Sequence, residues 1–425
     1  MSQYLLVSFN RQLPSSAKGK DVTKFIEGLI GNFGKLSEFP ISMDLAKFTS
    51  QDQLVSIADE LARLDTTTFG LLTRAARNIQ DLIKKIEFDN ERGWSDLLPN
   101  EKFQRIEPPT LEVAIEEGND TIFYSIPQYL QKWQWEESQI NSRRMINEMC
   151  AHFANEVQHQ DDELRTASTA YTEAGNKIIA LRRRNEGSLL VRNLDEVGSV
   201  MQQVKSFSDY GPTKASKTPI YVNTRNLITV LVVLKKGGAA DFEKNYMVQS
   251  RYVVPVPPQI IESDNDFNCY AVTILRENVD DYKTACKEHG WHVRDFKYNP
   301  NMKAEMAEEA KEVVKGYINE STKYADHLQT TFTHLAVCWL HIKALRVFAE
   351  STLLYGIPPN FQAFLIDATP KNIPKIHKEL EKVYNDGLPD MHDKADENDN
   401  FDDSELEHPY FSSQINLLGL LPTNK

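Results

Sequence analysis

The stretch SRRMINEMCAHFANEVQHQDDELRTASTAYTEAGNKIIALRRRNE (142–186) decides the fold. It contains no proline and one glycine, and mostly apolar residues recur in it at alternating steps of four and three. This heptad pattern predicts one long helix whose seam packs against a neighbour. The seam consists of Met149, Phe153, Val157, Gln160, Leu164, Ala167, Tyr171, Ala174, Ile178 and Leu181. Three arginines before Gly187 are typical of a helix C-terminus.

A helix of this length does not fit inside a compact molecule. About 45 residues give a rod of ~67 Å, whereas a compact chain of this size would have a diameter of about 57 Å. A second proline-free stretch runs from Pro300 to Pro358, with Gly316 and Asn319 as candidate breaks. Two long helices separated by one block of sequence predict an antiparallel neck.

The block between the two helices has its own alternation of elements. Its order, βαββαβ, resembles a ferredoxin-like sandwich and predicts an α/β head. The expected elements are a strand at 227–234, a helix at 239–249, strands at 252–257 and 267–276, a helix at 279–290 and a strand at 291–298. The lead-in at 205–222, with one glycine and two prolines, predicts a loop.

Both ends of the chain carry short strand-like runs, YLLVSF (4–9) and YFSSQINLLGL (410–420). Pairing of these runs in one sheet would close a discontinuous foot domain, with helices expected at 51–64, 69–86 and 371–384. The predicted fold is therefore an α+β chain in the form of an elongated dumbbell. Its expected parts are a foot at 1–141 and 326–425, a neck at 142–165 and 300–325, and a head at 166–299.

Composition limits the classes of partner. The 425 residues are 41% hydrophobic and 26% charged, which is ordinary for globular domains. Of the formal charge of −13, most comes from ten acidic residues against one lysine between Asn385 and His408. This stretch predicts a disordered acidic loop (385–408). Because the charge is acidic and local, we expect no nucleic-acid partner.

The sequence also favours a cytosolic location. Its longest apolar stretch, Leu227 to Leu234, is less than half of the roughly 20 residues of a membrane span. A strand-like run close behind Met1 disfavours a signal peptide. Cysteines 150, 269, 286 and 338 have no close spacing, which argues against a disulfide framework and a cysteine zinc site. We therefore expect no membrane insertion and a reducing compartment.

No segment has the spacing of a catalytic, cofactor or metal site. The stretch GLIGNFGKLS (28–37) has its glycines at the wrong offsets for a phosphate loop, and Gly237-Gly238 predicts a turn. The histidines at 152 and 159, and at 327, 334 and 341, are seven residues apart, which is about 10 Å along a helix and too far to share a metal. His289 and His292, near Cys286, lack a fitting further ligand.

We therefore predict no catalytic, cofactor-binding or metal-binding residue, and an interaction protein in preference to an enzyme. An active site assembled from residues far apart in the sequence remains an alternative.

One segment resembles a known family. WLHIKALRVFAESTLLYGIPPNFQAFLI (339–366) is similar to the signature of the C subunit of the V-type proton-pumping ATPases. Four further segments agree with that family: WQW (133–135), RRNEGSLLVRNL (183–194), DFEKNYM (241–247) and VRDFKYN (293–299). The family has FQW in place of the first of them. The signature is matched by Trp339, His341, Lys343, Ala344, Leu345, Arg346, Val347, Glu350, Ser351, Tyr355, Gly356 and Pro358.

The resemblance implies a non-catalytic stator subunit on the cytosolic face of vacuolar and other endomembranes. In this family the head binds a stalk made of the E and G subunits, and the foot contacts a second stalk and the cytoplasmic part of the membrane-sector a subunit. The family's members leave the pump during reversible disassembly, and some relatives bind actin. The segments 205–222 and 385–408 depart from the family pattern and inherit no role. An actin-binding or scaffold protein independent of the pump is the alternative.

Overall fold

The computed structural model describes most of the chain in two compact units. Unit 1 comprises 1–88, 106–169 and 322–425, and unit 2 comprises 89–105 and 170–321. Most of the predicted loop at 205–222 and all but His408 of the predicted acidic loop at 385–408 lie outside the described residues. The described residues are 3–12, 21–95, 97–98, 101–117, 120–186, 188–191, 194, 197, 201–204, 220–247, 253–294, 296, 301–384 and 408–421.

A four-stranded antiparallel sheet lies at the centre of one part of unit 1. The strands are β1 (Gln3–Asn10), β2 (Gly34–Phe39), β11 (Phe361–Ala368) and β12 (Phe411–Ile415), in the order β12-β1-β11-β2. The predicted pairing of the two terminal runs in one sheet is confirmed. Strands β11 and β2 were not predicted; β11 begins inside the segment interpreted as the family signature (339–366), and β2 begins inside the stretch weighed as a phosphate loop (28–37).

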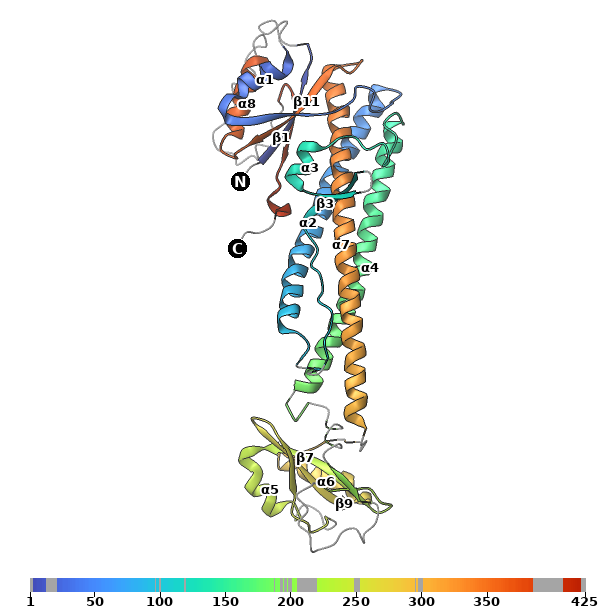
Figure 1. Cartoon of the computed structure of the whole chain (residues 1–425), viewed down its shortest axis with the longest axis vertical. Coiled ribbons are helices and arrows are strands. Elements are labelled where there is room, and N and C mark those ends of the chain that lie inside the picture. The colour runs from blue at the N-terminus through green and yellow to red at the C-terminus, as the bar shows by residue number, and fades with distance from the viewer. Residues whose placement is uncertain are drawn as a thin grey trace. The chain divides into compact units, whose positions relative to one another are not determined.

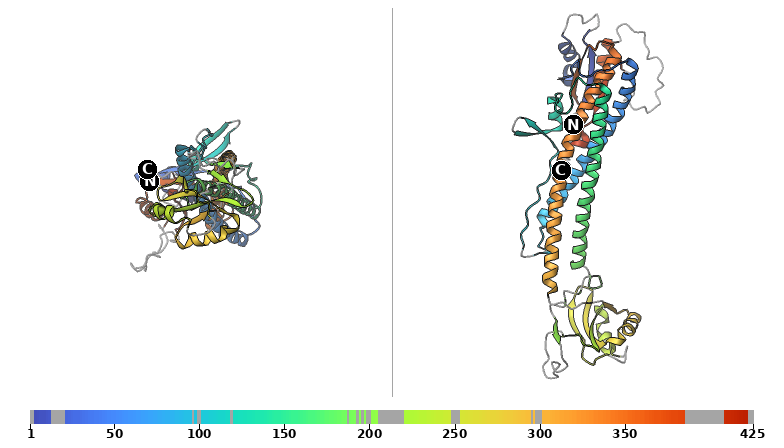
Figure 2. Two further views of the ribbon diagram at one scale, coloured as in Figure 1. Left: turned by 90° about the horizontal axis from the view of Figure 1, so that it is seen from below. Right: turned by 90° about the vertical axis from the view of Figure 1, so that its right-hand side faces the viewer.

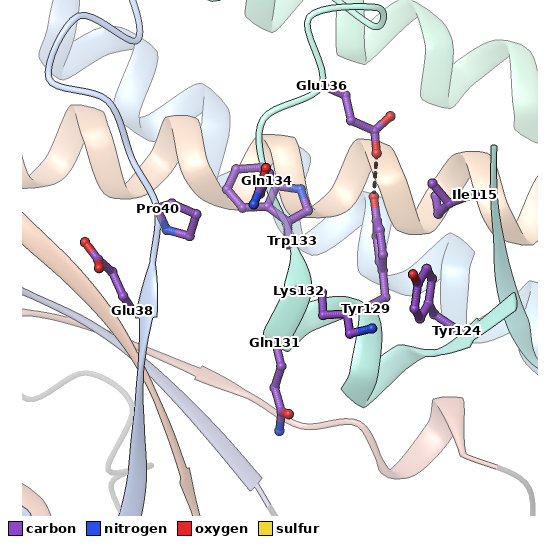
Figure 3. Close-up of a pocket in the computed structure, with 10 residues that line it drawn as sticks. All are labelled: Glu38, Pro40, Ile115, Tyr124, Tyr129, Gln131, Lys132, Trp133, Gln134 and Glu136. Carbon is purple, nitrogen blue, oxygen red and sulfur yellow. Dashed lines mark hydrogen bonds between the residues drawn. The ribbon is translucent and has the colours of Figure 1, made fainter. Parts of the chain in front are cut away.

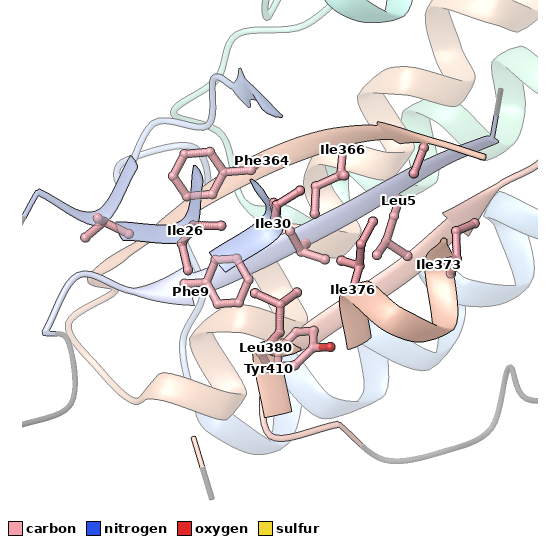
Figure 4. Packing of buried hydrophobic residues seen from close by; sticks show 13 residues of the cluster. Leu5, Phe9, Ile26, Ile30, Phe364, Ile366, Ile373, Ile376, Leu380 and Tyr410 are labelled. Carbon is pink, nitrogen blue, oxygen red and sulfur yellow. The ribbon is translucent and has the colours of Figure 1, made fainter. Parts of the chain in front are cut away.

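The sheet is covered on both faces. On one face, alternate side chains of β1, including Leu5 and Phe9, pack against helices α1 (Val22–Ile30) and α8 (Ile373–Tyr384) (Figure 4). On the other face, the Ser8 hydroxyl lies 2.6 Å from the hydroxyl of Ser351, which belongs to a long helix. Because alternate strand residues point to opposite faces, β1 is buried throughout its middle. The predicted helix at 371–384 is confirmed as α8.

Three long helices lie side by side in unit 1 (Figures 1 and 2). They are α2 (Gln51–Arg92), α4 (Ile146–Glu186) and α7 (Met302–Tyr355), and each continues into unit 2. The guanidinium of Arg74 on α2 bonds to the carboxylate of Asp161 on α4, so an ion pair joins these two helices.

The prediction of separate helices at 51–64 and 69–86 is wrong, because α2 is continuous through DTTTFG (65–70). The hydroxyls of the three threonines in this run donate to the carbonyl oxygens four residues earlier, so these hydroxyls are satisfied within the helix. The expected breaks at Gly316 and Asn319 are also absent from α7. A helical glycine costs only about 1 kcal/mol, and buried Val314 and Tyr317 flank it.

The predicted seam of α4 is confirmed by burial. Of its ten residues, all are buried except Ala167 and Tyr171, which are partly buried. In unit 1, Phe153 of α4 contacts His341 of α7, and Ser168 bonds to Tyr324. In unit 2, Tyr171 stacks on Tyr317, and the Arg184 guanidinium makes two bonds to the Glu309 carboxylate. In each unit, residues with higher numbers on α4 contact residues with lower numbers on α7. The two helices therefore run antiparallel within each unit.

Unit 2 contains a second four-stranded antiparallel sheet. Its strands are β7 (Leu227–Lys235), β8 (Gln259–Ser263), β9 (Phe267–Leu275) and β10 (His292–Arg294), in the order β10-β7-β9-β8. Helices α5 (Ala239–Asn245) and α6 (Val279–Glu288) supply Phe242 and Tyr282 to the core on one face. The chain order is β7, α5, β8, β9, α6, β10.

The strand predicted at 252–257 is wrong. The strand of this hairpin is β8, which begins at Gln259, and of the described residues 253–258 only Val253 forms an isolated bridge. Three prolines, at 255, 257 and 258, have no N–H to donate to a neighbouring strand. The strand therefore forms only after the last proline.

The remaining elements are short. They are β3 (Glu112–Glu117), β4 (Asp120–Ser125), α3 (Ile126–Lys132), β5 (Gln202–Val204), β6 (Ile220–Val222) and the 3₁₀ turns Gly31–Phe33, Lys236–Gly238, Arg276–Asn278 and Leu418–Leu420. Strands β3 and β4 form a hairpin that leads directly into α3. The predicted α+β class is confirmed, because the described residues combine long helices with two four-stranded antiparallel sheets.

Candidate functional site

A buried carboxylate joins three elements of unit 1. Asp65 of α2 is 4% exposed and accepts hydrogen bonds from Trp339 Nε1 at 2.9 Å and from Lys343 Nζ at 2.8 Å, both on α7. Arg346 of α7 donates to the same carboxylate at 3.0 Å. Lys343 Nζ also lies 3.3 Å from the hydroxyl of Ser413 on β12. The Asp65 cluster, defined by these five residues, therefore links α2, α7 and the C-terminal strand.

The charges in the Asp65 cluster depend on one another. Burial lowers the pKa of Lys343, and the Asp65 carboxylate opposes that shift by attracting the ammonium group. Arg346 is held from its other side by Glu350 at 2.5 Å. A cavity of about 610 Å³ lies beside the cluster and is also lined by His377 and His408. Because each cation here already has a carboxylate partner, the cluster is suited to fastening helices together.

Other signature residues fasten α7 to the sheet. The Tyr355 hydroxyl donates to the backbone carbonyl of Ser8 on β1 at 2.6 Å. Gly356 follows the last turn with a φ of 93°, and its N–H bonds to the carbonyl of Thr352. A residue with a Cβ rarely adopts such a φ, which explains the glycine where α7 ends. The polar positions of the signature thus have structural partners among the described residues.

His341 lies in an aromatic cage in unit 1. Its ring centroid is 4.8 Å from that of Trp135, 5.4 Å from that of Trp133 and 5.6 Å from that of Phe153. Its Nδ1 is 2.8 Å from the Val337 carbonyl oxygen, and its Nε2 is 3.1 Å from the backbone nitrogen of Glu136. A carbonyl can only accept and a backbone N–H can only donate, so the ring is neutral with its proton on Nδ1. Burial lowers the pKa of His341 to about 4, although the Val337 carbonyl opposes the shift.

A second cavity, the α3 pocket, lies beside this cage (Figure 3). Its volume is about 620 Å³. The Tyr129 hydroxyl in it donates to the Glu136 carboxylate at 3.1 Å. It is lined by Glu38, Pro40, Ile115, Tyr124, Tyr129, Gln131, Lys132, Trp133, Gln134 and Glu136. Sequence reasoning did not predict this pocket, because its residues come from three segments, and the only signal was the density of aromatic residues at 124–135.

The glycine segments that were weighed as nucleotide-binding loops lie in a strand and in a turn. Gly34 and Lys35, the nearest approach to a phosphate loop, lie in β2. A Cβ on Gly34 would be 2.9 Å from a side-chain carbon of Ile366 on β11, so close strand packing explains this glycine. Gly237 and Gly238 lie in a 3₁₀ turn after β7, as the prediction of a turn requires.

The other histidines considered for metal binding make separate local contacts. His159 lies 3.5 Å from Glu163, His327 lies 3.5 Å from Thr331, and His289 stacks on Trp291. Across the described ranges, no three His, Cys, Asp or Glu side chains are placed to hold a metal ion together. In the same part of the chain, no helix combines the length and apolar character needed to cross a membrane.

The comparison with family models decides the family. The model of the V-ATPase C subunit matches residues 4–414. The chain belongs to the family of V-ATPase C subunits. The matched range contains most of both units. It also contains the signature residues of the Asp65 cluster and of the aromatic cage.

Curated relatives agree over most of their length. The C 1 subunit of the V-type proton ATPase of Macaca fascicularis is 29% identical over 354 residues, which are 83% of this chain and 81% of the relative. The C 1 subunit of Xenopus laevis is 29% identical over 339 residues, or 80% of this chain and 78% of the relative. The C 1-B subunit of Danio rerio is 27% identical over 341 residues, with coverage of 80% and 78%.

One solved structure matches the chain with low sequence identity and a low TM-score. It is the cytoplasmic N-terminal domain of the I subunit, a homolog of the a subunit of V-ATPase, with 7% identity, coverage of 90% of this chain and 98% of that chain, and a TM-score of 0.25. A TM-score of this size carries no argument about the fold or about partners.

We expect Asp65→Asn to destabilise unit 1 strongly. The substitution leaves the buried ammonium of Lys343 without its carboxylate, and breaking a buried ion pair costs roughly 3 to 5 kcal/mol. Urea unfolding followed by circular dichroism measures the change. As a control, the double variant Asp65→Leu/Lys343→Met removes both buried charges and should recover part of the loss. A double variant as unstable as Asp65→Asn would contradict the role assigned to the ion pair.

We expect His341 to make the stability depend on pH between about 6.5 and 4. Its pKa is lower in the folded chain, at about 4, than the ordinary value of about 6.5 in the unfolded chain. The unfolded chain therefore takes up a proton first as the pH falls, and stability is lost through this window. Between pH 7 and pH 5 the loss should be about 2 kcal/mol.

Denaturant titrations at both pH values on the wild type and on His341→Gln measure this contribution. Glutamine offers an acceptor to the Glu136 N–H but does not titrate, so the variant should lose about 2 kcal/mol less over the same interval. Equal losses in the two proteins would show that His341 does not titrate as described.

Proposed function

We propose that this chain is a non-catalytic stator subunit of a V-type proton-pumping ATPase. In this role it joins peripheral stalks of the E and G subunits to the membrane-sector a subunit, on the cytosolic face of vacuolar or other endomembranes, and takes part in reversible assembly. The observation that carries the proposal is the family match over residues 4–414. The relatives are named as subunits of V-type proton ATPases, which supports membership of that assembly.

The internal construction of the helices supports a mechanical role. A stator must resist the torque of a rotary motor without bending. In unit 1 the buried Asp65 carboxylate joins α2 to α7, and the bond between Arg74 and Asp161 joins α2 to α4. Cross-links of this kind oppose sliding of one helix along another, because each slide would leave a charge without its partner. Packing along the α4 seam adds to this stiffness.

We propose the dumbbell arrangement as the working shape, with a foot at 1–141 and 326–425, a neck at 142–165 and 300–325 and a head at 166–299. Small-angle scattering of the purified chain measures the shape directly. We expect a radius of gyration clearly above ~22 Å, the value for a compact chain of this length. A value near 22 Å would contradict an elongated chain.

We expect the purified full-length chain to bind an E–G heterodimer in a saturable way. Isothermal titration calorimetry with the purified heterodimer measures this binding, and a chain unfolded by heat is the control for non-specific heat. The tagged chain should also copurify the E, G and a subunits from membranes. A chain that binds neither the heterodimer nor these subunits would be an independent scaffold, such as an actin-binding protein, and the stator proposal would be wrong.

A further inference from the structure

The α3 pocket contains a carboxylate without a cation. Glu136 is partly buried, and burial raises the pKa of its carboxyl group. Its hydrogen-bond partners are neutral, the Tyr129 hydroxyl and the Gln139 side chain, and none of the described lysine, arginine or histidine side chains forms an ion pair with it. A carboxylate held away from water in this way gains free energy from an incoming cation.

The position of Glu136 is fixed by the aromatic cage. Its backbone N–H donates to Nε2 of the buried His341, so the backbone from which the carboxylate projects is anchored to α7. Figure 3 shows the Glu136 side chain directed toward Tyr129, on the same side of the pocket as Tyr124 and Ile115. Preorganisation lowers the entropy cost of binding, because the side chains on the protein are already ordered.

The α3 pocket also offers ring faces suited to a cation. The ammonium of Lys132 lies 4.7 Å from the centroid of the Tyr124 ring. This contact demonstrates that the Tyr124 face accepts a positive charge. Lys132 itself is exposed, so a ligand can displace its long side chain from the ring at little cost. A second carboxylate, that of Glu38, lines the pocket on the side of β2.

The indole N–H of Trp133 is a second, independent indication that the pocket binds a ligand. Trp133 is 2% exposed, and its Nε1–H has no hydrogen-bond acceptor in the described part of the chain. The indole is stacked on Phe39 with ring centroids 4.6 Å apart, which fixes its orientation. Figure 3 shows its nitrogen on the side that faces Tyr129 and Glu136. Buried donors in proteins are rarely left unpaired, so this N–H indicates that the pocket also receives an acceptor.

We propose that the α3 pocket binds an arginine side chain carried by an extended segment of a partner protein. The guanidinium pairs with Glu136 and stacks on Tyr124 in place of Lys132. A carbonyl of the same segment provides the acceptor for the Trp133 N–H. Arginine fits better than lysine, because a planar guanidinium stacks on a ring and bonds to a carboxylate at the same time.

The charge and the size of the pocket agree with this ligand. The charged side chains that line the pocket are two carboxylates, Glu38 and Glu136, and one lysine, Lys132. The volume of about 620 Å³ holds one long side chain with its flanking peptide groups. The proposal does not depend on the stator function, because it concerns a peptide and can be tested without any ATPase component.

The test uses the full-length chain and the peptide acetyl-Ala-Arg-Ala-amide, followed by calorimetry. We expect saturable binding of the arginine peptide. Binding should be at least about tenfold weaker when citrulline replaces arginine, because citrulline keeps the shape and loses the charge. The norleucine peptide should not bind. Equal binding of the arginine and citrulline peptides, or no saturable binding of the arginine peptide up to about 10 mM, would overturn the proposal.

Matched variants locate the site. Glu136→Gln keeps the backbone bond to His341 and should weaken binding of the arginine peptide at least about tenfold. Glu137→Gln is the control, because Glu137 is the next residue, does not line the pocket and accepts a bond from the Ser142 N–H. This control should bind like the wild type. An effect of the same size in both variants would contradict the proposed site.

A second variant serves if Glu136→Gln does not fold. Tyr124→Leu removes the ring face at a partly buried position of the hairpin, and thermal unfolding checks that the fold is retained. It should weaken binding of the arginine peptide about three- to tenfold. Unchanged affinity in a folded Tyr124→Leu variant would mean that the guanidinium does not use this pocket.

Discussion

The buried carboxylate of Asp65 is the constraint on which the construction of unit 1 depends. It brings together the indole of Trp339, the ammonium of Lys343 and the guanidinium of Arg346, and through Lys343 it reaches Ser413. A charge in an apolar interior is costly unless its partners are placed correctly. The relative positions of α2, α7 and β12 are therefore restricted more tightly than apolar packing alone would restrict them.

The aromatic cage and the α3 pocket depend on the same helix. His341 lies two residues before Lys343 on α7, and it fixes the backbone of Glu136 by accepting its N–H. Glu136 then presents its carboxylate to the pocket beside Tyr129. The signature segment of the family thus has two structural effects. One side of α7 joins the helices and the sheet, and the other positions a polar pocket.

In the proposed stator role, the chain transmits force and binds partners without transforming a substrate. Helices tied by buried charges provide stiffness, while small sheets and pockets provide surfaces of defined shape. The family of V-ATPase C subunits, to which the chain belongs, is consistent with this division of labour. An arginine-binding pocket at this place would couple a partner to α7 through the bond between Glu136 and His341.

The sequence alone determined the elements whose patterns are local. The heptad series of α4, the terminal runs of β1 and β12, and the signature at 339–366 were all identified from it. The continuity of α2 and α7 was not, because threonines and glycine lower helix propensity locally while hydrogen bonds and burial outweigh that cost. The Asp65 cluster and the α3 pocket were decided only by the tertiary structure. Asp65 and Lys343 are 278 residues apart, and no periodicity in a sequence indicates which distant charge a buried lysine will meet.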